Sequence, residues 1–161
     1  MTNSQDIQSL INSATSNLDH LVSTIRILLY RSRARLQLLI STGANQTASK
    51  RRGVVTEVEG MCTLVSSLSA TAIDIARTTS AAIASYAGDS QGSDSSSSPN
   101  DLPAEARKAV DFLQHLELSL DRINAQNVGN LVLIRSAVQR HEAVYEAAAM
   151  LDQLIARLRL R

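Results

Sequence analysis

The fold is decided by residues 102–160, which read LPAEARKAVDFLQHLELSLDRINAQNVGNLVLIRSAVQRHEAVYEAAAMLDQLIARLRL. No proline follows Pro103, and apolar residues recur every three or four positions almost to the end of the stretch. This spacing places one apolar stripe along an α-helix. The stretch therefore predicts a helix over residues 102–160, with a buried stripe that another helix must cover.

The stripe is irregular at one place, where Ile123, Asn127 and Leu131 are spaced four residues apart. Gly129 lies there too, and a glycine costs a helix about 1 kcal/mol relative to alanine. Two interpretations fit equally: Asn127 is a buried residue that sets the register of the helices, or it flanks a short turn at residues 127–130. We expect one continuous helix, because the stripe resumes on nearly the same face.

Two earlier stretches, residues 4–42 and 47–87, carry the same kind of stripe. Their apolar positions recur every 3.5 residues on average, which is typical of a coiled coil or a helical bundle. The stripe of the first contains Ile7, Ile11, Ala14, Leu18, Leu21, Ile25 and Leu28. The stripe of the second contains Val54, Val58, Met61, Val65, Leu68, Ala72, Ile75, Thr79, Ala82 and Tyr86.

Residues 88–101 separate the second and third helical stretches. They contain glycine, serine, three aspartates and Pro99, with no basic residue. A segment of this composition has little to bury, so we expect a flexible acidic linker. Ser98 precedes Pro99 and has Asp101 three residues on, which makes it a candidate phosphorylation site. A plain tether is the simpler interpretation.

These patterns predict a single all-α domain over residues 1–161. We expect an antiparallel bundle of three long helices with coiled-coil-like heptad packing, or of four helices if the last one breaks near Asn127 and Asn130. Only four residues are aromatic, and 44% are hydrophobic, which suits the packing of helix on helix.

The composition also limits which partners and which cellular location are expected. Sixteen basic and fifteen acidic residues leave no strong overall field for nucleic acid or membrane. The chain has no basic start followed by an apolar block, and we find no uncharged apolar run of membrane-spanning length. We therefore expect an intracellular, cytoplasmic protein.

Catalytic signatures are missing from the sequence. None of His20, His115 and His141 has a histidine or carboxylate partner at a metal-binding spacing, and there is no glycine-rich phosphate motif. The single cysteine, Cys62, lies in an apolar run and is expected to be a buried small hydrophobe. We therefore expect no enzyme, no metal or other cofactor, and no small-molecule substrate.

The last helix offers a candidate surface for a partner helix. A continuous helix over residues 102–160 is longer than the second helix, so its end would overhang with an uncovered stripe that seeks another helix. This expected partner-helix seam consists of Leu131, Ile134, Val138, Tyr145, Leu151, Leu154, Ile155 and Leu158.

Basic residues gather around the connection between the first two helices, in a segment without acidic residues. If these helices form an antiparallel hairpin, the residues share one end, which can bind phosphate groups or an acidic partner. A solvated hairpin end is the common alternative. This expected anion-binding tip consists of Arg31, Arg33, Arg35, Lys50, Arg51 and Arg52.

The sequence thus predicts a non-enzymatic helical interaction protein. In the first hypothesis it is a subunit or adaptor of a larger assembly, joined to a protein partner or to itself through helix packing. In the alternative, the bundle docks on an anionic surface, membrane or nucleic acid, through the basic tip. Binding through the tip should weaken sharply with added salt, whereas packing of apolar stripes should not.

Overall fold

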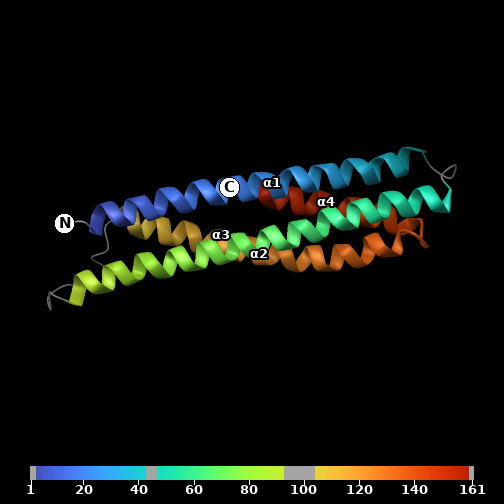
Figure 1. Ribbon diagram of the computed structural model, residues 1–161. Helices are drawn as coiled ribbons and strands as arrows, with labels where there is room; N and C mark the ends of the chain where they lie inside the picture. Colours follow the sequence, from blue (N-terminus) through green and yellow to red (C-terminus); the bar gives the residue numbers. More distant parts are fainter. Residues whose placement is uncertain (1–2, 43–46, 93–103, 160–161) are drawn as a thin grey trace.

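The structure, a computed structural model, describes residues 3–42, 47–92 and 104–159. It confirms the all-α prediction: four long antiparallel helices pack as a bundle (Figure 1). Coiled-coil packing between the helices stays a prediction. The helices are α1 (Asn3–Thr42), α2 (Ala48–Gly92), α3 (Ala104–Ser136) and α4 (Glu142–Arg159).

The helices are arranged so that α2 contacts α1 and α3, and α4 contacts the same two helices from the other side. α1 and α3 hardly touch each other directly. α4 has 18 residues against 40 in α1, about 27 Å against 60 Å at the rise of an α-helix. It lies beside the end of the bundle that holds the α3–α4 turn and ends near the middle (Figure 1). One half of the bundle therefore has four helices, and the other half has three.

The expectation of one continuous helix over residues 102–160 is wrong. The chain turns at residues 137–141, about ten residues beyond the place where the sequence suggested a break. The amide of Arg140 donates to the carbonyl of Ser136 at 2.7 Å, and the amide of Ala143 donates to the carbonyl of Arg140 at 3.0 Å. This turn contains neither glycine nor proline, so the usual local signal is missing.

The turn removes the expected overhang. Because α4 folds back along α3, its apolar stripe packs inside the bundle instead of extending beyond α2. The buried residues of α4 are Ala143, Val144, Ala147, Ala148, Leu151, Leu154, Ile155 and Leu158.

α3 continues without a break through residues 127–130. Its buried positions keep the spacing of three and four residues because Asn130, and not Leu131, faces the interior. The apolar pattern is irregular here because a second asparagine, Asn130, takes a buried position that an apolar residue would usually occupy. Gly129 is exposed on the outer side of α3, and a Cβ added there would meet no atom within 4 Å.

The buried face of α2 lies one position away from several predicted residues. Val58, Val65, Ala72 and Thr79 are buried as expected, but Val54, Met61, Leu68 and Ile75 are only partly buried at its sides. The small residues Cys62, Ser69 and Ala76 lie between them in the interior. Small side chains at the centre let α1 and α3 approach α2 closely, and the larger ones fill the two flanks.

α2 also extends to Gly92, beyond the predicted end at residue 87. No proline interrupts the chain before Pro99, and Gly88 weakens a helix without ending it. The rest of the predicted linker, including Ser98, lies outside the described residues.

The segment Ala48–Ser85 of α2 is long and apolar enough to cross a membrane by length and composition alone. This differs from the expectation that no stretch qualifies, because the alanine-rich second half of α2 carries few charges. A helix in the interior of a bundle meets the same criterion, and α2 buries one face between α1 and α3. The segment is therefore weak evidence for a membrane span.

Candidate functional site

A layer of polar side chains crosses the interior where α1, α2 and α3 meet. The amide nitrogen of Asn127 donates to the backbone carbonyl of Cys62 at 2.7 Å and to the hydroxyl of Ser66 at 2.8 Å. The amide of Asn130 lies 4.0 Å from the sulfur of Cys62, whose thiol lies 3.9 Å from the hydroxyl of Ser32. The layer therefore joins three helices through one buried cysteine.

The side chains of this layer are suited to hydrogen bonding and not to nucleophilic attack. Burial raises the pKa of the Cys62 thiol to about 11, so the thiol stays protonated and is a poor nucleophile. The Oδ1 atoms of Asn127 and Asn130 are buried with no hydrogen-bond partner within residues 3–42, 47–92 and 104–159. In the same described part of the chain, no three His, Cys, Asp or Glu residues gather as a metal site would need.

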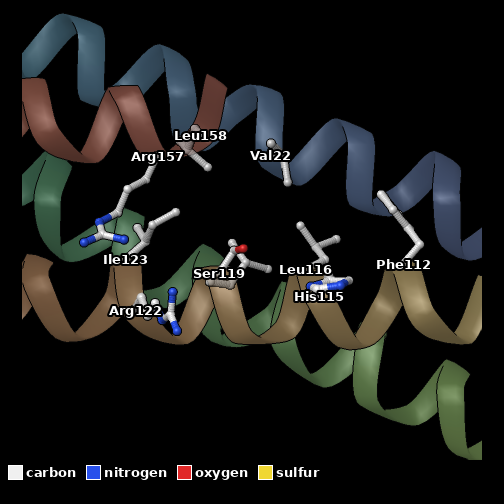
Figure 2. A pocket seen from close by; sticks show the side chains of 10 residues that line it. Val22, Phe112, His115, Leu116, Ser119, Arg122, Ile123, Arg157 and Leu158 are labelled. Carbon is white, nitrogen blue, oxygen red and sulfur yellow. The ribbon is translucent and has the colours of Figure 1, made fainter. Parts of the chain in front are cut away.

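The end of α4 is tied to its neighbours by two arginines. Arg26 of α1 donates to the carbonyl of Leu158 at 3.2 Å, and Arg157 donates to the side-chain oxygen of Gln126 on α3 at 2.8 Å. Beyond this point no fourth helix fills the space between α1 and α3 among the residues that the structure describes. Figure 2 shows the last turn of α4 ending above α3, with Val22 of α1 and Leu116 of α3 pointing into the space that follows.

This space is a groove, which we call the α1–α3 groove. It consists of two hollows of about 340 and 250 Å³ that both include Phe112. On α3 it runs from Lys108 to Ile123, about 22 Å or four helical turns. The apolar residues that line it are Ile11, Ala14 and Val22 of α1, Ala109, Phe112, Leu113, Leu116, Leu120 and Ile123 of α3, and Leu158 of α4.

One edge of the α1–α3 groove is basic. Lys108, His115 and Arg122 follow one another every seven residues along α3, so they stand on one side of that helix. Arg157 of α4 adds a fourth nitrogen-bearing side chain where the groove begins. No carboxylate lines the groove in the part of the chain that the structure describes.

The predicted partner-helix seam is used within the chain. Ile134, Leu151, Leu154, Ile155 and Leu158 are buried, and Leu131 and Val138 are partly buried against the core. Tyr145 is 48% exposed and meets the ring of His141 edge-on at 5.5 Å, while Val144 takes the interior position. The seam residues hold α4 in the bundle.

The predicted basic tip is partly neutralised by acidic residues from elsewhere in the chain. Arg33 pairs with Asp152 of α4, and Arg35 pairs with Glu57 of α2 at 2.8 Å. Arg51 donates to the carbonyl of Val138 in the α3–α4 turn at 3.4 Å. The other three tip residues are exposed, and no described carboxylate lies within ion-pair distance of them; they are Arg31, Lys50 and Arg52.

Sequence reasoning missed the α1–α3 groove. The seven-residue spacing of Lys108, His115 and Arg122 is visible in the sequence, but it gains meaning only when the neighbouring helix is known. The groove also depends on where α4 begins, which follows from a turn without a local signal.

Comparison with known proteins gives no family for this chain. No protein-family model, no curated protein and no solved structure matches it.

Proposed function

We propose that this chain is a non-enzymatic helical interaction protein, a subunit or adaptor of a larger assembly that acts through helix packing. The observation that carries this proposal is the α1–α3 groove, whose two adjoining, mostly apolar hollows together follow about four turns of α3. A groove of this kind accepts the apolar face of an amphipathic helix. The occupant is a helix of a protein partner.

α4 supports this proposal because it fills the same inter-helical space in the other half of the bundle. It lies between α1 and α3 and buries a stripe of alanine, valine, leucine and isoleucine side chains. The α1–α3 groove continues this space in line with α4, between the same two helices. A partner helix with a similar stripe would complete the four-helix arrangement along the whole bundle.

We expect a photo-crosslinking residue in the groove to capture the partner. Phe112 is 40% exposed and lines both hollows, so Phe112→p-benzoylphenylalanine places the reactive group at the centre of the groove. Cells that make this variant should yield, after irradiation, an adduct with a defined second protein, identified by mass spectrometry.

The matched control is Leu118→p-benzoylphenylalanine, on the same helix but 58% exposed and not in the groove lining. Adducts that are the same at both positions, or none at either, would contradict a helix-binding role for the groove. An adduct with a second copy of this chain would shift the proposal from adaptor to self-association.

A second candidate function is docking on an anionic surface. Three tip residues, Arg31, Lys50 and Arg52, support it, since they are exposed and free of acidic neighbours among the described residues. Their positive charge would attract phosphate groups of lipids or nucleic acid.

If this second candidate holds, the triple variant Arg31→Gln, Lys50→Gln, Arg52→Gln should bind phosphatidylserine vesicles more weakly, by about fivefold per removed charge. Co-sedimentation at low and high salt measures this, and salt should weaken the binding of the unchanged protein. Arg77→Gln, on the part of α2 beside Glu117, is the control and should bind as the unchanged protein does. Vesicle binding that ignores both salt and the triple variant would exclude the tip as the docking surface.

A further inference from the structure

We propose that the α1–α3 groove selects a helix that combines an apolar face with carboxylates along one edge, spaced seven residues apart. This inference rests on the proposed function and names the chemistry of the partner. It follows from the floor of the groove, from the nitrogen-bearing side chains along its α3 edge and from the way in which α4 occupies the same space.

The floor requires an apolar face on the partner. Val22, Leu116 and Ile123 line the larger hollow, next to the end of α4, and Phe112 lines both hollows. In Figure 2, Leu116 and Phe112 rise from α3 towards α1, and Val22 points down towards them. Side chains of leucine or valine at every third or fourth position of a helix would cover these groups and remove them from water.

The edge of the groove favours acidic groups on the α3 side only, although the exposed Asp111 stands between Lys108 and His115 without lining the groove. Lys108, His115 and Arg122 project from α3 at intervals of seven residues, which is about two turns or 10.5 Å. The α1 side of the lining offers only apolar residues and Thr15. A partner helix with carboxylates at the same seven-residue interval would meet this row of side chains along its length, whether it runs parallel or antiparallel to α3. Basic groups on that edge would be repelled.

α4 provides an internal example of the apolar face. Its apolar stripe is buried against α1 and α3, and Asp152, next to the buried Leu151, pairs with Arg33 of α1. This pair of helices therefore already accepts an apolar helix face, although the carboxylate of α4 pairs on the α1 side and not on the α3 edge. Arg157 lies at the end of α4, where one end of the partner helix would contact it. It adds positive charge at that end of the groove.

Two synthetic helical peptides of 15 residues test this inference. Both carry leucine and alanine on one face; one has glutamate at every edge position, and the other has lysine there. Fluorescence anisotropy measures their binding to the full chain. The glutamate peptide should bind about tenfold more tightly than the lysine peptide at low salt, because several exposed ion pairs each contribute a modest amount. Added salt should narrow the difference.

Charge reversal in the groove should invert this preference. The variant Lys108→Glu, Arg122→Glu should bind the lysine peptide more tightly than the glutamate peptide. The matched control is Arg107→Glu, Arg31→Glu, which makes the same charge change at two exposed residues outside the lining. The control should keep the preference of the unchanged protein.

The outcomes separate this inference from the proposed function. The two peptides could bind equally well, and the variant Lys108→Glu, Arg122→Glu could leave this binding unchanged. If a folded Phe112→Ala variant then loses the binding, the preference for acidic groups is overturned, but the groove remains a site for a helix. Failure of both peptides to bind would count against the groove and the proposed function together. Loss of binding in Leu118→Ala, Val132→Ala instead would place the peptide on the outer side of α3 and overturn both. A dimer in light scattering that Phe112→Ala converts to a monomer would make a second copy the occupant and overturn the acidic partner.

Discussion

Replacing Asn127 by aspartate should lower the free energy of unfolding by about 3–5 kcal/mol at pH 7, because it places an unpaired charge in the interior. The Asn127 side chain is 0% exposed, and its amide nitrogen donates to the Cys62 carbonyl and the Ser66 hydroxyl. A carboxylate has no hydrogen to donate, and it would face the carbonyl oxygen at about the distance of the present hydrogen bond.

The loss should depend on pH in a defined direction. Burial would raise the pKa of the new carboxyl group above its value of about 3.9 in the unfolded chain. Between these two pKa values the folded state binds more protons than the unfolded state, so stability falls as pH rises and then levels off above the folded-state value. Near pH 4 most of the loss should disappear, because a protonated carboxyl can donate one hydrogen bond to the Cys62 carbonyl. About 1 kcal/mol should remain for the missing second donor.

Urea denaturation followed by circular dichroism at pH 4 and pH 7 measures this difference, with the unchanged protein at each pH as reference. Gln126→Glu is the matched control, since it makes the same amide-to-acid change one residue away. The Gln126 side chain accepts from Arg157, so the new carboxylate gains a positive partner and stability should change by less than about 0.5 kcal/mol. If Asn127→Asp lowers the free energy of unfolding equally at both pH values, the charge of the new carboxyl group is not what destabilises the protein.

Replacing Leu151 by alanine should lower the free energy of unfolding by about 2–5 kcal/mol, the range for truncating a buried leucine. Leu151 is 0% exposed and lies in the middle of the stripe by which α4 packs on α1 and α3. α4 is short, and its apolar contact with α1 and α3 runs through this stripe, so a cavity there should loosen the whole helix.

Hydrogen exchange should locate this effect. Protection should fall first in α4, and in the part of α1 around Arg33, which pairs with Asp152. The control is Gln153→Ala, an exposed position two residues away, whose effect should stay within about 0.5 kcal/mol. If both variants lose the same stability, the stripe of α4 contributes little to the bundle.

The part of the fold that the sequence predicts well is the part that depends on local spacing. Apolar residues three and four positions apart indicate helices wherever they occur, and the bounds of α1, Asn3–Thr42, match the predicted range of 4–42 closely. The turn at residues 137–141 has no such signal, because it is favoured by the packing of α4 against α1 and α3. The burial of Asn130 was not predicted for the same reason. A polar side chain is buried where another helix supplies a polar neighbour, here Cys62 of α2, and the local sequence does not show this.

The candidate site was predictable only in part. The density of basic residues near the α1–α2 connection is plain in the sequence, but the acidic partners Glu57 and Asp152 reach them only through the fold. The α1–α3 groove lies between α1 and α3 beyond the described end of α4. Its shape depends on the relative lengths of helices, which composition and spacing do not describe.

The length of α4 determines how much of the α1–α3 groove is open. Each additional heptad on its C-terminal end would cover about 10.5 Å of the groove, so about two heptads would close it. Each heptad removed would uncover the same length of apolar channel and draw the end of α4 away from Arg26 and Gln126. Insertions and deletions of seven residues at this one helix end would thus change the reach of the bundle in fixed steps while the other three helices keep their packing.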